Sequence, residues 1–128
     1  MDTASLIDEA DEHDEMLFPL IRSKYRMAWV MVFFDLPVDT KAARKRAGDF
    51  RKSLLREGFI KVQFSVYARP CASPEKVRSE LRRVKSAIPV AGEVRAMTIT
   101  DAQWARMIVY CGARKEKPEK MPEQLLLF

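Results

Sequence analysis

A single carboxylate, Asp35, occupies the position in this chain that is best suited to chemistry. It ends an unbroken apolar run, residues 28–34, and is followed at once by Leu36 and Pro37. A short run that is rich in valine and aromatic residues and closes at a proline predicts a β-strand. Asp35 is therefore expected at the end of a strand, where its carboxylate could bind a cation.

Other familiar catalytic arrangements do not occur in the sequence. The one histidine, His13, falls in an acidic N-terminal stretch, so the body of the protein cannot form a Ser–His or Cys–His pair. The four glycines are isolated, and no glycine-rich phosphate-binding motif is present. Carboxylate and metal chemistry remain. Because Mg²⁺ takes about six oxygen ligands, one aspartate needs waters, a phosphate or a second carboxylate beside it.

A second copy of the chain could supply that second carboxylate. In a two-fold dimer, two Asp35 side chains that face each other could share one Mg²⁺ per dimer, and the ion would activate a water against a phosphodiester. Without the ion, two close carboxylates would repel and one would tend to keep a proton. The alternative is that Asp35 merely ends its strand and caps a local amide.

The strand that leads to Asp35 is apolar on both faces and must be covered on both. One face carries Trp29, Met31 and Phe33, and the other carries Val30, Val32 and Phe34. Helices of the same chain can cover one face. We expect a second copy, packed sheet against sheet, to cover the other.

The remaining elements follow from the pattern of apolar residues. We expect a strand near 27–35, a helix that ends before Gly58, a strand at 59–69 that can split near 63–65, a helix from 74 to 88, a strand at 93–100, a turn at 101–103 and a strand at 104–111. This order predicts the α+β class: a βαββαβ sandwich with an antiparallel sheet, both helices on one face, and an extra C-terminal strand.

Both ends of the chain differ from this central domain, which is expected to span residues 23–112. Residues 1–22 carry a cluster of acidic side chains and are predicted to be a largely disordered extension. Residues 113–128 are predicted to form a linker and a docking strand. Four apolar residues at a terminus need a partner, either a sheet edge or a groove: Leu125, Leu126, Leu127 and Phe128.

Charge is unevenly distributed along the sequence. Residues 1–26 hold seven acidic and three basic residues, whereas residues 27–128 hold eleven acidic and twenty basic residues. A body with a net charge of +9 favours a polyanion such as nucleic acid as partner. No apolar run approaches a membrane span and the N-terminus is acidic, so we expect a cytoplasmic protein with no membrane partner and with Cys71 and Cys111 reduced.

Three segments together resemble a known family. They are residues 27–37, which end in Asp35–Leu36–Pro37; Phe50–Arg51–Lys52 with Gly58–Phe59; and residues 63–67, Gln-Phe-Ser-Val-Tyr. Over about residues 25–112 the chain is similar to CRISPR-associated protein 2, the small partner of the CRISPR spacer-acquisition integrase. The arginine-rich first helix and Thr98–Ile99–Thr100 are most similar to members from type II systems.

The resemblance implies a ferredoxin-like fold and a homodimer that bridges two dimers of the integrase, CRISPR-associated protein 1. It places the family's metal-binding aspartate at Asp35, with Mg²⁺ as the cofactor. Some relatives are described as Mg²⁺-dependent ribo- or deoxyribonucleases, and in others the protein serves as a scaffold that grips DNA. The family's use of a C-terminal strand to join a neighbour suits residues 123–128. The acidic residues 1–22 lie outside the match.

Three hypotheses follow. In the first, the dimer is a scaffold that binds double-stranded DNA (a prespacer or the CRISPR repeat) through its phosphates. In the second, Asp35 serves a Mg²⁺-dependent endonuclease as catalytic and metal-binding residue. In the third, the chain is a protein-interaction module with an incidental basic surface. The residues expected to contact DNA in the first are Lys41, Lys45, Arg51, Lys52, Arg78, Arg82 and Arg83.

Overall fold

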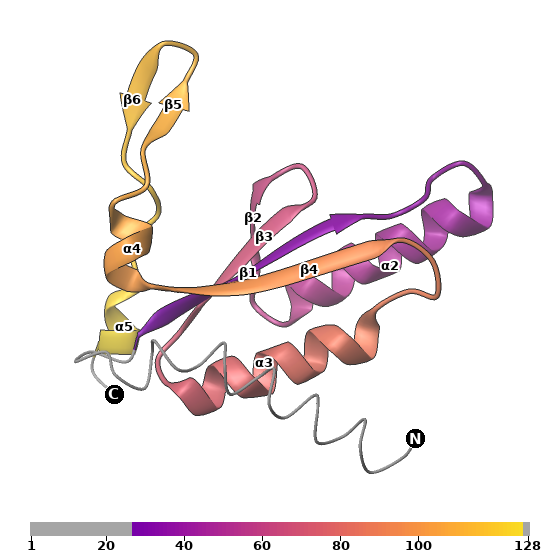
Figure 1. The fold of residues 1–128 in the computed structure, drawn as a ribbon, viewed down its shortest axis with the longest axis horizontal. Helices are drawn as coiled ribbons and strands as arrows, with labels where there is room; N and C mark the ends of the chain where they lie inside the picture. Colours follow the sequence, from indigo (N-terminus) through magenta and orange to yellow (C-terminus); the bar gives the residue numbers. More distant parts are fainter. Residues whose placement is uncertain (1–26, 127–128) are drawn as a thin grey trace.

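The core of the protein is a four-stranded antiparallel sheet. A computed structural model describes residues 27–126. The strands run in the order β2-β3-β1-β4, so β1 lies between two partners (Figure 1). Their bounds are β1 (Ala28–Asp35), β2 (Ile60–Gln63), β3 (Val66–Cys71) and β4 (Glu93–Thr100). All three pairings are antiparallel, which confirms the predicted sheet.

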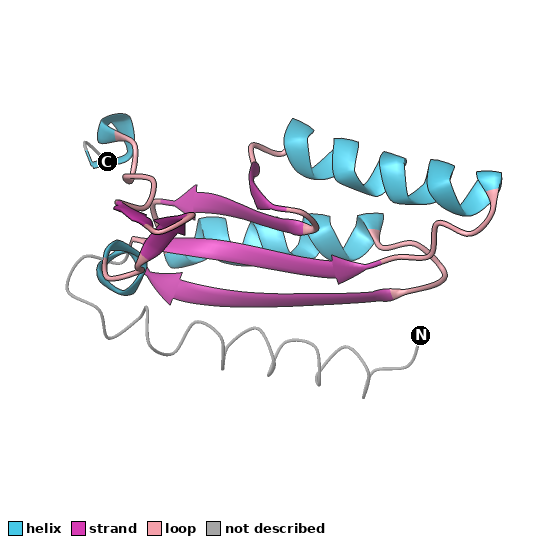
Figure 2. Ribbon diagram, turned by 90° about the horizontal axis from the view of Figure 1, so that it is seen from above, coloured by secondary structure: helices cyan, strands magenta, loops and turns pink. Residues whose placement is uncertain are grey.

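Two long helices, α2 (Lys41–Arg56) and α3 (Pro74–Ala87), lie on one side of this sheet (Figure 2). Each begins at a capping side chain, as such residues predict. The Thr40 hydroxyl accepts a hydrogen bond from the Ala43 amide at 3.0 Å, and the Ser73 hydroxyl accepts one from the Lys76 amide at 3.2 Å. The α+β, ferredoxin-like prediction is therefore confirmed for one chain.

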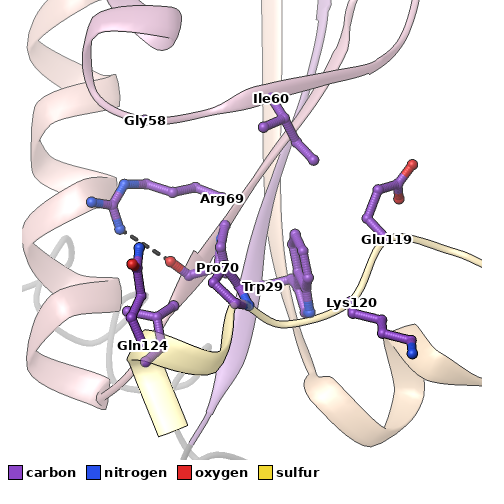
Figure 3. Close-up of a pocket in the computed structure, with 10 residues that line it drawn as sticks. Trp29, Gly58, Ile60, Arg69, Pro70, Glu119, Lys120 and Gln124 are labelled. Atoms are coloured by element: carbon purple, nitrogen blue, oxygen red, sulfur yellow. Dashed lines mark hydrogen bonds between the residues drawn. The ribbon is translucent and has the colours of Figure 1, made fainter. Parts of the chain in front are cut away.

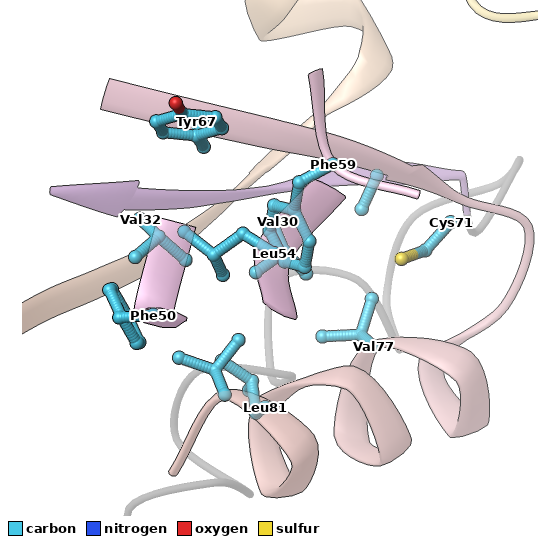
Figure 4. Packing of buried hydrophobic residues seen from close by; sticks show 11 residues of the cluster. Val30, Val32, Phe50, Leu54, Phe59, Tyr67, Cys71, Val77 and Leu81 are labelled. Atoms are coloured by element: carbon cyan, nitrogen blue, oxygen red, sulfur yellow. The ribbon is translucent and has the colours of Figure 1, made fainter. Parts of the chain in front are cut away.

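The main core fills the space between the sheet and these helices (Figure 4). Val30 and Val32 of β1 face the helices and are fully buried. Phe50 and Leu54 of α2 are 2% and 1% exposed, and they belong to the same core cluster as these two valines. Burial of these apolar side chains is the main force that holds the helices on the sheet.

The long strand expected at residues 59–69 is divided, as predicted, near residues 63–65. The pairing of β2 with β3 shifts register between Lys61 and Gln63, and the chain turns at Phe64 and Ser65. Ser65 adopts a left-handed backbone conformation (φ 59°). Its carbonyl accepts a hydrogen bond from the Phe34 amide at 3.0 Å, which ties the turn to the end of β1.

The prediction of one continuous strand at residues 104–111 is wrong. Residues Asp101–Ala105 form a short helix, α4, and only β5 (Val109–Cys111) is extended; it pairs with β6 (Arg114–Glu116) in a hairpin that projects from the sheet (Figure 1). The cause is a capping box: the Thr100 hydroxyl accepts from the Gln103 amide, and the Gln103 side chain accepts from the Thr100 amide. The extra C-terminal strand therefore belongs to a separate two-stranded sheet.

The predicted docking strand is also wrong for residues 123–126, which form a short helix, α5 (Glu123–Leu126). Leu125 packs against a cluster around Trp29 in the same chain. Leu127 and Phe128, the side chain of Leu126 and the acidic extension 1–22 lie outside the described residues. Within residues 27–126, no helix is long and apolar enough to cross a membrane.

Candidate functional site

The sheet has an open face, which we define as the face opposite α2 and α3. Where β1 begins, the chain covers this face itself. Trp29 is 1% exposed and stacks on Trp104 of α4, with ring centroids 4.1 Å apart and planes within 10°. Met121 and Leu125 complete the cluster. The prediction that a second copy covers this whole face is therefore wrong for its Trp29 half.

A pocket of about 410 Å³ lies at this covered end, between Trp29, Ile60 and the segment that carries Glu119 to Leu125 (Figure 3). Arg69 and Lys120 are the two cations in its lining. The Arg69 guanidinium already donates hydrogen bonds to the Glu57 carbonyl and to the Pro70 carbonyl, the latter at 3.1 Å. Since these bonds hold the guanidinium against its own chain, Arg69 acts here to fix the backbone at the end of β3.

The other half of the open face, toward Asp35, is only partly covered and largely apolar, with the exposed Arg95 directly opposite Phe33. Strand alternation and register place Met31, Phe33, Val66 and Met97 together on it. Met97 is 45% exposed, and the other three are half-buried. This is the surface on which a second copy is expected to pack.

Asp35 ends β1 at the rim of that surface, as the sequence predicts. It is exposed, and alternation from Phe33 places its side chain on the open face. Glu93, the first residue of β4, is its direct register partner. Directly opposed residues have Cβ atoms about 4.5–5.5 Å apart, so each chain presents two neighbouring carboxylates. Glu93 also pairs with the Arg95 guanidinium, which raises the pKa of Arg95.

Glu93 was not predicted as a site residue, because nothing in the linear sequence gives the register of β4 against β1. The signal was indirect: once a β1–β4 antiparallel pair is assumed, the residue that opens β4 must lie near the residue that ends β1. The pairing also requires the chain to approach closely at Gly92.

Gly92 supports the end of β1. Its backbone has φ +99°, a conformation that side chains disfavour. A Cβ atom at this position would lie 2.7 Å from Leu36 Cδ2 and 2.9 Å from the Asp35 carbonyl oxygen. Glycine therefore allows the loop before β4 to press against the residues that carry the candidate carboxylate.

The donor atoms at this site suit Mg²⁺, because the ion prefers carboxylate oxygens and water. One chain is not sufficient, since residues 27–126 contain no cluster of three His, Cys, Asp or Glu side chains arranged to hold a metal ion. Asp35 and Glu93 from each of two chains would give four carboxylates. A metal site at this position would need waters, a phosphate or the carboxylates of a second chain to complete its ligands.

The predicted DNA-contacting residues lie on α2 and α3, on the other side of the sheet from Asp35. Most are exposed, but Arg78 is half-buried. Lys45 pairs with Asp49 at 2.9 Å, and its ammonium group lowers the Asp49 pKa. Arg83 pairs with Glu57 at 3.0 Å and with the fully buried Glu80 at 3.2 Å, so its guanidinium also stabilises the α3 packing.

The helices concentrate positive charge on this side of the molecule. The α2 sequence contains seven lysines and arginines against one aspartate, and α3 contains five against two glutamates. The two groups of predicted site residues are therefore separated: cations on the helices, and carboxylates on the rim of the open face. The structure does not bring them into one catalytic pocket.

Comparison with known proteins now identifies the family. The sequence profile described as CRISPR associated protein Cas2 matches residues 27–107, from the start of β1 to just beyond α4. The chain belongs to the Cas2 family. This confirms the resemblance drawn from Asp35–Leu36–Pro37 and residues 63–67, and it makes the protein a CRISPR-associated one.

Three curated Cas2 relatives cover most of this chain, and each is named "CRISPR-associated endoribonuclease Cas2". The protein from Parvibaculum lavamentivorans is 47% identical over 100 residues, 78% of this chain and 99% of its own. The one from Flavobacterium psychrophilum is 41% identical over 92% of this chain and 98% of its own. The one from Paracidovorax avenae is 45% identical over 81% and 96%.

Proposed function

We propose that this Cas2-family protein acts in CRISPR spacer acquisition as a homodimeric scaffold. The two chains pack through the Phe33 half of their open faces, and the helices bind duplex DNA, a prespacer or the CRISPR repeat, through its phosphates. The dimer bridges two dimers of the integrase, CRISPR-associated protein 1. The observation that carries this proposal is the separation of a cationic helix side from a partly covered apolar sheet face.

Duplex binding follows from the chemistry of the helix side. Lysine and arginine side chains on an exposed helix contact phosphates and release condensed counterions, without reading the base sequence. No glycine-rich loop or exposed aromatic row lies on the outer faces of α2 and α3, whose sequences contain one aromatic residue, the buried Phe50. Contacts of this kind therefore bind many DNA sequences equally well.

The test measures duplex affinity at several salt concentrations. We expect log K to fall linearly with log salt, with a slope of about −0.9 for each phosphate contacted, and with little difference between duplexes of unrelated sequence. Lys52→Ala reduces the slope, whereas Lys115→Ala, on the projecting hairpin, leaves it unchanged. A flat salt response, or strong preference for one sequence, would contradict the proposal.

The second candidate function is a Mg²⁺-dependent endonuclease. It is favoured by the name of the relatives, CRISPR-associated endoribonuclease Cas2, and by the neighbouring positions of Asp35 and Glu93. Asp35 and Glu93 of both chains would hold the ion, which when bound lowers the pKa of a coordinated water and polarises a phosphoryl oxygen. The protein's own task is to keep these carboxylates close together and exposed at the dimer rim.

The two functions are separable by one variant. Asp35→Asn removes a charge at the candidate metal site and is expected to abolish Mg²⁺-dependent cleavage of RNA or DNA, while duplex binding and dimer mass stay as in the wild type. Asp39→Asn, an exposed acid just before α2, is the matched control and should leave cleavage intact. Cleavage that survives Asp35→Asn would exclude Asp35 as the catalytic residue.

A further inference from the structure

A basic groove lies between α2 and the turn that joins β2 to β3, and it shares only Arg51 with the predicted duplex-binding residues. Its volume is about 280 Å³. Three cations line it, Arg44 and Arg51 from α2 and Lys61 from β2, and no carboxylate does. Such a lining favours an anion. Phe34 and Tyr67, which pack on each other at the edge of the main core, also line the groove.

Phe64 stands at the tip of that turn and contributes to the groove. It is 89% exposed, and the Lys61 ammonium lies 4.2 Å from its ring centroid. The turn is fixed rather than loose: Ser65 has φ 59°, and its carbonyl accepts the Phe34 amide hydrogen bond at 3.0 Å. An aromatic ring held in solvent beside three cations is suited to stack on a nucleic-acid base.

Gly48 leaves the groove unfilled. A Cβ at this position of α2 would meet no atom within 4 Å, so the helix could carry an alanine here without a clash. Glycine weakens a helix interior relative to alanine, and the packing of this helix gives no reason for it. The space over Gly48 is explained if a ligand enters between α2 and the Phe64 turn.

We propose that this groove binds one unpaired nucleotide of single-stranded DNA. The base stacks on the Phe64 ring, and the Arg44 and Arg51 guanidiniums bind the flanking phosphates. Arg44 is oriented at the groove by a hydrogen bond from its Nη1 to the Val38 carbonyl, 3.1 Å. The choice of DNA as ligand rests on the proposed function. An unpaired nucleotide is required, because bases inside a duplex are already stacked and cannot reach a side-chain ring.

The experiment compares three probes on the full-length protein: oligothymidylate, an abasic oligonucleotide of the same length, and a blunt duplex. The first two carry the same phosphate charge and differ in the presence of bases. We expect wild type to bind oligothymidylate about tenfold more tightly than the abasic strand, in the range of one base stacked on an aromatic side chain.

Two variants test whether the preference for oligothymidylate over the abasic strand arises at this groove. Phe64→Ala is expected to bring the ratio of the two affinities close to one. Gly48→Leu, which fills the groove and favours the helix, is expected to do the same without lowering the melting temperature. Tyr110→Ala removes another exposed aromatic, on the β5–β6 hairpin, and is expected to keep the wild-type ratio.

The outcomes separate the nucleotide-site proposal from the duplex-scaffold proposal. Equal affinity of wild type for the two single strands, or a ratio that neither groove variant changes, overturns the nucleotide site. If the blunt duplex binds while the ratio is one, the groove proposal fails and the scaffold proposal stands. If the duplex fails to bind but the ratio depends on Phe64 and Gly48, the scaffold proposal fails and the groove remains.

Discussion

The two faces of the sheet are built from the same strands but differ in how fully the chain buries them. On the helix side, Val30, Val32 and Phe50 are buried by elements of one chain. On the open face, the neighbouring residues Met31 and Phe33 are only half-buried, although the sequence of β1 is equally apolar on both sides. The difference shows that strand hydrophobicity alone does not tell which face is completed within a chain and which stays partly exposed.

The largest expected effect is on the helix side. Phe50→Ala removes a side chain that is 2% exposed and contacts Phe34 edge-on, with ring centroids 5.1 Å apart. We expect a loss of about 3–5 kcal/mol in the free energy of unfolding, measured by denaturant titration. Phe33→Ala, the matched change on the open face, is expected to cost clearly less. Equal losses would remove the contrast between the faces.

The second-largest effect is expected on dimer formation through the open face. Phe33→Glu places a charge where the second chain is proposed to pack, and burying an unpaired charge is unfavourable. We expect the dimer dissociation constant to rise about a hundredfold, measured by sedimentation or light scattering over a range of protein concentrations. A wild-type protein that is monomeric under the same conditions would contradict the interface itself.

The loop before β4 is expected to give an intermediate effect. Gly92→Ala forces a side chain into a left-handed backbone region and against the Asp35 carbonyl, so we expect a loss of about 2 kcal/mol in the free energy of unfolding. Gly112→Ala is a useful control, because Gly112 also has positive φ but its Cβ would meet no atom within 4 Å. A larger loss at Gly112 would mean that crowding beside Asp35 is not the cause.

The smallest effect concerns the cations on the helix side. The Lys45 ammonium lowers the Asp49 pKa, so their attraction is present above the ordinary carboxyl pKa and is lost as pH falls through the lowered value. Both groups are exposed, and solvent screens the pair. We expect Asp49→Asn to leave the denaturation midpoint within error at neutral pH. A measurable loss would show that α2 depends on this pair.

The sequence predicted the parts of the fold that rest on local signals. The β1 run, the end of the first helix before Gly58 and the split near residues 63–65 are all encoded within a few residues, and all were predicted correctly. The region after Thr100 was not. Trp104, Ile108 and Val109 resemble a strand by composition, but the Thr100–Gln103 capping box and the stacking of Trp104 on Trp29 stabilise a helical turn instead.

The candidate site was predictable in part for the same reason. The position of Asp35 follows from its own strand, whereas Glu93 requires the β1–β4 register and the basic groove requires the packing of α2 against the Phe64 turn. Arg44 and Arg46 both belong to the arginine-rich helix α2, and nothing local in the sequence distinguishes them. Residues that act together through tertiary contacts lie beyond what spacing along one chain can give.

The stacking of Trp29 on Trp104 has a practical consequence. These are the two tryptophans of the chain, and they lie ring on ring at the junction of β1 and α4. All of the protein's indole fluorescence thus originates at this junction. The strongest part of its near-ultraviolet circular dichroism is expected to originate there too. An optical melt would report when the C-terminal segment leaves the sheet, separately from the far-ultraviolet signal of the long helices.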